Sequence, residues 1–161
     1  MRRVEGSGNV ALIERVNPIR DKWRVRWDVR VAEDGMASYM EEEFGHRPTV
    51  AEVRALVSGW INGNTNAAIL SGFSYEGSVV WLSTENQFNY KAAYDLAVQT
   101  GGASLPVTIK IGEEDDPVYK TFDTLDALTA FYTAAMAHVR KTLEEGWKAK
   151  DGFDVTPYRL E

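Results

Sequence analysis

The segment KWRVRWDVRV, residues 22–31, alternates apolar and polar side chains with a period of two. This period is typical of a β-strand, because successive side chains point to opposite faces of a sheet. One face carries Trp23, Val25, Trp27, Val29 and Val31, and the other carries Lys22, Arg24, Arg26, Asp28 and Arg30. The pattern predicts a strand with one dry face, on which the tryptophans are buried while Arg24 and Arg26 stay accessible.

This strand is expected to belong to a three-stranded antiparallel meander. Asp34-Gly35 favours a tight two-residue turn, since glycine accepts a positive φ. The segment 36–44 then forms the returning strand, and 9–16 forms an earlier strand that ends at Asn17-Pro18. Residues 1–8 are polar and are predicted to be loose.

Capping signals mark two helices in the middle of the chain. Thr49–Glu52 reads as a capping box, and the apolar side chains that follow it recur at helical spacing. Asn62-Gly63-Asn64 is predicted to interrupt this helix, and Gly72 to end it. A second capping box, Thr84–Gln87, opens a helix that runs to about Gln99. Its inward-facing residues are predicted to be Phe88, Ala92 and Leu96, together with Tyr94.

Two hairpins and a long helix complete the expected elements. The first hairpin covers 73–82 and turns at Glu76-Gly77, and the second joins 105–111 to 117–122 across the acidic turn Glu113–Asp116. The last helix, 124–146, has a full apolar stripe and is predicted to end at Gly146, followed by an irregular tail. The stripe consists of Leu125, Leu128, Phe131, Tyr132, Ala135, Val139 and Leu143.

The order of these elements predicts an α+β fold, with an antiparallel β-meander and hairpins packed with about three helices. Every visible strand junction is a hairpin, which argues against a parallel sheet. The expected organisation is an N-terminal meander over 1–47 and an α+β domain over 48–159, packed as one unit. Leu160-Glu161 is interpreted as a cloning scar.

Composition narrows the possible chemistry. The 161 residues include no cysteine and 2 histidines, so disulfides, thiolate metal sites and cysteine nucleophiles are excluded, and neither a metal nor a cofactor is expected. His46 and His138 stand in no metal-binding motif. The start MRRVEGSGNV has no apolar core, and no apolar run approaches membrane-span length. The expected location is cytoplasmic or virion-associated.

The arginines and tryptophans of 22–31 raise the alternative of a nucleic-acid-binding module that uses the basic face of this strand. A single-strand platform needs aromatic and basic groups on the same face, and here they fall on opposite faces. The net charge of −6 also argues against a general affinity for nucleic acid. Glu41, Glu42 and Glu43 lie on the next strand, and Glu41 and Glu43 are expected to share one face and to stand opposite Arg26 and Arg24 or their neighbours. Nucleic acid is therefore not expected as a partner.

No catalytic motif is present, so the chain is not expected to be an enzyme. A site built from scattered polar residues stays open as a further alternative; its members would be Asn86, Gln87, Asn89, Asp28 and Glu41. The candidate interaction surface combines the strand arginines with the polar run at 62–66, which is either a simple helix break or a recognition loop. Its residues are Arg24, Arg26, Arg30, Asn62, Asn64 and Asn66.

The central and C-terminal residues carry a set of loose motifs. These are a GF-x-x-x-G hairpin (Gly72, Phe73, Gly77), a T/S-x-x-N/Q helix start with Gln87 and Asn89, a short strand with Pro106 and Lys110, and a closing G-x-x-x-K (Gly146, Lys150). In these features residues 65–150 resemble a small domain of unknown function found in phage and prophage proteins, often beside or within tail-fibre genes and in mobile elements of gut bacteria.

The resemblance implies a structural or assembly role in a phage, prophage or mobile element, exerted through a protein partner. It implies no catalytic residues. Residues 1–47 lie outside it, so it does not explain the predicted meander.

Overall fold

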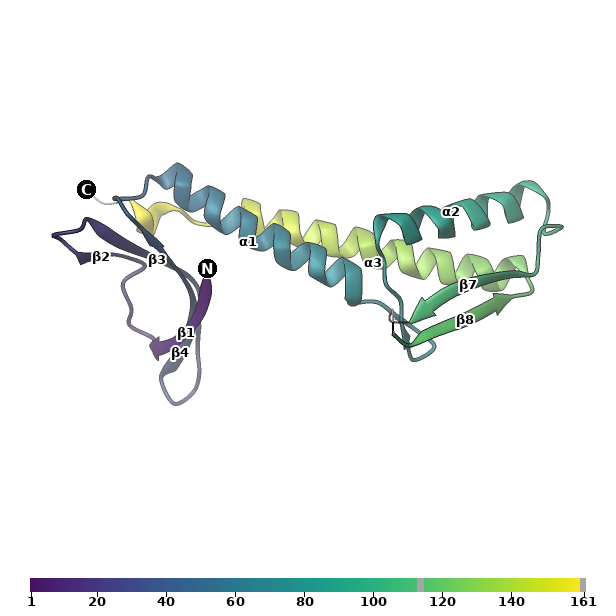
Figure 1. Ribbon diagram of the computed structural model, residues 1–161, viewed down its shortest axis with the longest axis horizontal. Helices are drawn as coiled ribbons and strands as arrows, with labels where there is room; N and C mark the ends of the chain where they lie inside the picture. The colour runs from purple at the N-terminus through teal and green to yellow at the C-terminus, as the bar shows by residue number, and fades with distance from the viewer. Residues whose placement is uncertain (113–114, 160–161) are drawn as a thin grey trace. The chain divides into compact units, whose positions relative to one another are not determined.

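The computed structural model describes residues 1–112 and 115–159 and confirms the α+β fold (Figure 1). The chain forms two compact units. The sheet unit contains residues 1–60 and the C-terminal segment from Lys150, and the helical unit spans Ile61–Ala149. The predicted division into 1–47 and 48–159 stays a prediction. The predicted acidic turn falls partly on residues 113–114, and the proposed scar on 160–161, both outside the described residues.

A four-stranded antiparallel sheet forms most of the sheet unit. Its strands are β1 (Arg2–Ser7), β2 (Ile13–Asn17), β3 (Lys22–Val31) and β4 (Met36–Phe44), in the spatial order β1-β4-β3-β2. The prediction that residues 1–8 are loose is wrong, because β1 pairs along its whole length with β4. That pairing joins segments far apart in the sequence, so no local sequence pattern predicts it. The predicted strand at 9–16 begins only at Ile13.

The β3–β4 hairpin differs from its prediction in two places. Its loop has three residues, because the Ala32 amide donates to the Met36 carbonyl (2.7 Å) and Gly35, at φ 82°, donates to Ala32 (3.0 Å). Within β3 the register shifts between Trp27 and Arg30, and Asp28 adopts φ 50°. This β-bulge reverses the alternation of side chains beyond it. Val31 is consequently exposed rather than buried.

The core of the sheet unit contains Val25 and Trp27 of β3, which are both fully buried. Trp27 meets Trp60 edge-on at a centroid distance of 6.2 Å. The buried hydroxyl of Tyr158 donates to the Arg26 carbonyl (2.7 Å). Trp23 is only half-buried, and its indole Nε1 donates to Asp21 (3.0 Å). The burial predicted for the two tryptophans is therefore complete at Trp27 and partial at Trp23.

Helix α1 (Val50–Ser71) begins at the predicted capping box. The Glu52 carboxylate accepts from the Thr49 amide (2.7 Å), and the Glu52 amide donates to Thr49 Oγ1 (3.2 Å). The predicted interruption at 62–64 is wrong, because the helix continues to Ser71 before Gly72. Asparagine and glycine each cost a helix at most about 1 kcal/mol. Burial of Ile61 and Ile69 on either side offsets this cost.

The helical unit contains both predicted hairpins. The first pairs β5 (Ser74–Tyr75) with β6 (Ser78–Val79), and the second pairs β7 (Val107–Gly112) with β8 (Pro117–Phe122). Helix α3 (Leu125–Asp151) lays its predicted apolar stripe on the same core as these hairpins. The fully buried residues of this core are Val80, Leu82, Ala97, Phe122, Leu128, Phe131 and Ala135.

Helix α2 (Thr84–Gln99) starts as predicted to within one residue. Ser83 rather than Thr84 caps it, because the Asn86 amide donates to Ser83 Oγ (3.2 Å). Of the residues predicted to face inward, only Tyr94, which is half-buried, packs against the core. Tyr90 and Ala97 are buried, whereas Phe88 is 69% exposed and Leu96 52% exposed. The helix carries apolar residues on two faces, so periodicity alone could not select the buried one.

Two expectations for the C-terminal part are wrong. Helix α3 does not end at Gly146, which lies buried inside it; a β-carbon there would stand 2.4 Å from Thr65 Oγ1. The glycine thus serves a close approach of α1 and α3 rather than a helix end. The tail is also partly regular, with a 3₁₀ turn at Thr156–Tyr158 that buries Tyr158.

Candidate interaction surfaces

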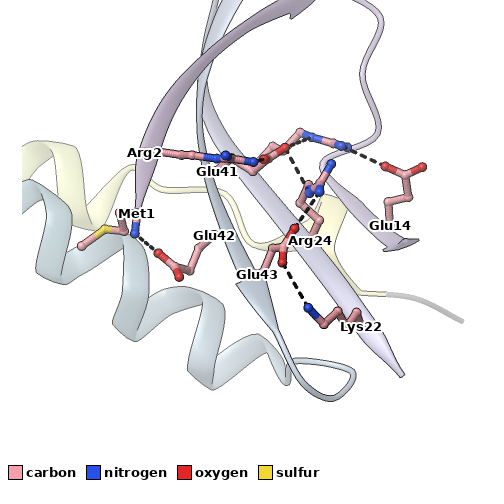
Figure 2. A network of polar contacts seen from close by, with 9 residues as sticks. Met1, Arg2, Glu14, Lys22, Arg24, Glu41, Glu42 and Glu43 are labelled. Atoms are coloured by element: carbon pink, nitrogen blue, oxygen red, sulfur yellow. Dashed lines mark hydrogen bonds and ion pairs between the residues drawn. The ribbon is translucent and has the colours of Figure 1, made fainter. Parts of the chain in front are cut away.

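Arg24 and Arg26 of β3 form a network with Glu41 and Glu43 of β4 on one face of the sheet (Figure 2). The strand register places Arg26 opposite Glu41 and Arg24 opposite Glu43. Directly opposed residues of an antiparallel pair point to the same face, so opposite charges meet there. The predicted pairing of the arginines with the glutamates is confirmed.

Glu41 is at the centre of this network and is only 3% exposed. Its carboxylate accepts from Arg26 Nε (2.9 Å) and from Arg2 Nη2 (3.1 Å). Arg24 Nε lies 3.3 Å from the same carboxylate, within ion-pair range but not aligned for a hydrogen bond. Three guanidinium groups thus surround one buried carboxylate.

Arg26 is 5% exposed, so the expectation that it is accessible is wrong. Besides Glu41, it donates through Nη1 to the Ala11 carbonyl (2.8 Å) and pairs through Nη2 with Glu14 (2.9 Å). Its guanidinium also lies over the Tyr39 ring, 5.6 Å from the centroid. Neighbouring side chains and backbone of the sheet unit therefore cover the Arg26 guanidinium.

The other basic residues of β3 also have acidic partners. Arg24, half-buried, donates to Glu43 (2.7 Å), which raises the pKa of Arg24 and lowers the pKa of the Glu43 carboxyl. Arg30 is exposed and pairs with Asp28 (2.9 Å), and Lys22 lies 3.8 Å from Glu43. The positive charge of this strand is largely compensated at the surface where nucleic acid would have to bind.

The predicted polar loop at 62–66 is instead part of α1. Asn62, Asn64 and Asn66 are all exposed on the helix. Asn62 and Asn66 share one side, four residues apart, whereas Asn64 points away from them at 100° per residue. The structure therefore does not gather these three side chains into one recognition site.

The outward face of α2 is apolar. Phe88, Ala92 and Leu96, which we call the α2 outer stripe, follow one another at intervals of four residues and are all exposed. Lys91 and Asp95 form an ion pair along one side of the stripe. The i, i+4 spacing of these residues predicts a core-facing stripe, and the structure shows the opposite orientation. The sequence signal for the observed orientation is the competing face formed by Tyr90, Tyr94 and Ala97.

An open cleft of about 820 Å³ lies beside the start of α2. Its lining includes Trp81, Ser83, Asn86, Lys110 and Asp115. Asn86 donates to the Trp81 carbonyl (2.7 Å), and neighbouring Gln87 donates to the Leu82 carbonyl (2.8 Å). These two side chains of the scattered polar set thus hold the turn that precedes α2.

The remaining members of that polar set are placed differently. Asp28 and Glu41 belong to ion pairs of the sheet unit, and Asn89 is exposed on α2. The structure does not show these residues as a common site.

Each histidine has a polar partner within the chain. His46 Nε2 lies 2.8 Å from Glu52, and His138 Nε2 lies 3.0 Å from the Ala68 carbonyl. Within residues 1–112 and 115–159, no group of three or more histidine or acidic side chains is arranged to hold a metal ion.

No protein-family model, curated protein or solved structure matches this chain. The resemblance of residues 65–150 to a phage-associated domain therefore stays a prediction. No helix in the described part of the chain has the length and apolar character needed to cross a membrane.

Proposed function

We propose that this protein is a structural or assembly accessory of a phage, prophage or other mobile element, and that it acts by protein–protein contact. The observation that carries the proposed mode of action is the α2 outer stripe. The genetic context rests on the resemblance of residues 65–150, and a cytoplasmic or virion-associated location follows from it.

Large apolar side chains scattered singly on a surface need no explanation, but a contiguous apolar surface marks a binding site. Phe88 and Leu96 are two turns apart on one side of α2, with only the small Ala92 between them. Anchors at such intervals are the usual contacts of a helix that packs on another protein. The stripe therefore supports a protein partner.

The polar residues considered as candidate sites are less suited to bind a partner. Arg26 is buried with Glu41 and Glu14, and Asn86 and Gln87 are occupied with backbone carbonyls. A protein partner that binds the stripe does not need these polar groups. It needs an apolar surface, because binding is driven by the removal of that surface from water.

The test compares the wild type with the double variant Phe88→Glu/Leu96→Glu, and with Val98→Glu as a matched control. Val98 is also exposed on α2 but lies about 120° around the helix from Ala92, at 100° per residue. Each protein is co-expressed and purified with the products of the neighbouring genes.

We expect one of these products to bind the wild type and the control equally, and the double variant at least tenfold more weakly. Equal binding by all three proteins would contradict the role of α2. Binding to none of the gene products would contradict the proposed accessory role.

A further inference from the structure

We propose that the α2 outer stripe binds a second copy of this chain, with the two α2 helices antiparallel across a two-fold axis at Ala92. This inference rests on the proposed function, since it names the partner of the same surface. It follows from the way in which the side chains of α2 would meet their own symmetry mates.

In this arrangement the apolar residues of one copy face apolar residues of the other. Phe88 and Leu96 lie four residues before and after Ala92, or about 6 Å along the axis at a rise of 1.5 Å per residue. In an antiparallel pair centred on Ala92, Phe88 of one copy faces Leu96 of the other, twice. The small side chain at the centre lets the helix axes approach to the usual distance of about 8–10 Å.

Charged residues of opposite sign also face each other across the two copies. Lys91 and Asp95 lie on the same side of the stripe, about 1.5 Å before and about 4.5 Å after Ala92 along the axis. The two-fold axis keeps this side of both copies together. Lys91 of one copy then stands within about 3 Å, along the axis, of Asp95 of the other, so the interface gains two symmetric pairs of opposite charge.

Residues near the two ends of α2 also pair across the two-fold axis. Glu85 and Gln99 lie seven residues before and after Ala92, so each glutamate would face a glutamine amide of the second copy. A parallel pair would instead set the Lys91 side of one helix beside the Asn89 side of the other. It would leave Lys91 and Asp95 without opposite charges across the interface. The geometry thus selects the antiparallel arrangement.

The size of the surface sets the expected affinity. Helix α2 has 16 residues and is about 24 Å long. A single pair of such helices buries less than the roughly 1,600 Å² of a standard interface. We therefore expect a reversible dimer with a dissociation constant in the micromolar range.

Sedimentation equilibrium over a range of concentrations tests the association. We expect the wild type to shift from monomer to dimer, Phe88→Glu to raise the dissociation constant at least tenfold, and Val98→Glu to leave it unchanged. Thermal melts show whether the variants stay folded, which is expected because both positions are exposed. A dimer that is equally strong in Phe88→Glu would overturn the inference.

Charge reversal tests the orientation. Lys91→Glu alone places two acidic groups together across the interface, and Asp95→Lys alone places two basic groups together, so each variant should dimerise more weakly than the wild type. An equimolar mixture of the two restores both opposite-charge pairs and should form a heterodimer. A mixture that associates no better than its components would overturn the antiparallel arrangement.

A single engineered thiol provides a direct contact test, because the chain has no cysteine of its own. Ala92→Cys lies on the proposed two-fold axis and should form a disulfide-linked dimer under mild oxidation, whereas Val98→Cys should stay largely uncross-linked. Equal cross-linking of both variants, or of neither, contradicts the proposal.

The outcomes separate this inference from the proposed function. A wild type that remains monomeric up to millimolar concentration overturns self-association. The stripe could then still bind a product of a neighbouring gene, and the co-purification experiment decides that independently.

Discussion

Arg26 and Glu41 form a buried ion pair, and each of the two side chains has further polar partners. Glu41 accepts from Arg2 and Arg26, and Arg26 also reaches Glu14 and the Ala11 carbonyl. Such a pair contributes little net stability compared with a well-packed apolar replacement. Removal of one partner is costly, however, because it leaves an uncompensated buried charge.

We therefore predict that Glu41→Ala lowers the free energy of unfolding by about 3–5 kcal/mol. The matched control is Glu43→Ala on the same strand face, where the carboxylate is exposed and water can solvate the arginine left behind. The control should lose much less stability. Urea denaturation measures both values, and similar losses for the two variants would contradict the buried network.

At the scale of single elements, two helix-interior glycines, Gly63 and Gly146, have opposite surroundings. Gly63 of α1 has nothing within 4 Å of the position that a β-carbon would occupy. At Gly146 of α3, that position lies 2.4 Å from Thr65 Oγ1 and 3.1 Å from Thr65 Cγ2. The intrinsic preference of a helix for alanine is the same at both positions, so packing alone separates them.

We predict that Gly63→Ala raises the free energy of unfolding by about 1 kcal/mol, as helix propensity requires. Gly146→Ala should instead lower it by about 1–3 kcal/mol through overpacking. Thr65→Ala should recover much of this loss in the Gly146→Ala background, since it removes the clashing atoms. Chemical denaturation of the four proteins provides the measurement, and stabilisation by Gly146→Ala would refute the close approach of α1 and α3.

The capping box of α1 makes stability depend on pH. Hydrogen bonds from the Thr49 backbone and side chain, and the contact with His46, lower the pKa of Glu52 from 4.5 to about 2. Between these pKa values the unfolded chain binds a proton that the folded chain does not, so folding becomes less favourable as the pH falls through this range.

We predict that part of the wild-type loss of melting temperature between pH 4.5 and about pH 2 is due to Glu52. Glu52→Gln should be less stable than the wild type at neutral pH and should show a shallower decline over the same interval. Melting curves at closely spaced pH values are the measurement. Parallel declines for the two proteins would show that the capping carboxylate does not titrate as described.

At the scale of the whole molecule, the charge balance argues against nucleic acid as the partner. The net charge is −6, and the basic residues of β3 are paired with Glu14, Asp28, Glu41 and Glu43. Phosphate would have to displace these carboxylates. Affinity for duplex DNA falls with salt at a log–log slope of about −0.9 for each phosphate that a protein neutralises.

We predict no measurable binding of single- or double-stranded oligonucleotides at a physiological ionic strength of about 0.15 M. At lower salt, binding should be no tighter than the usual non-specific range of about 10⁻⁴–10⁻⁶ M. Fluorescence anisotropy across salt concentrations is the assay. Sub-micromolar binding that persists at physiological salt and weakens in Arg24→Glu would promote the nucleic-acid alternative.

The sequence by itself determined the features that depend on neighbouring residues. The alternation in 22–31, the capping box at Thr49–Glu52, the turn at Glu76-Gly77 and the apolar stripe of α3 each led to the observed element. Backbone preferences, caps and side-chain periodicity act over a few residues, so a short window of sequence contains the forces that decide them. The α+β class follows from these elements.

Only the tertiary structure decided which segments meet. It paired β1 with β4, reversed the β3 alternation at Asp28, turned Phe88 and Leu96 outward and kept α3 helical through Gly146. Each outcome depends on contacts between residues far apart in the chain, whose packing energies outweigh the local preferences that favoured another result. The burial of Arg26 and the exposure of the α2 outer stripe are consequences of that packing, which is why sequence reasoning misplaced both.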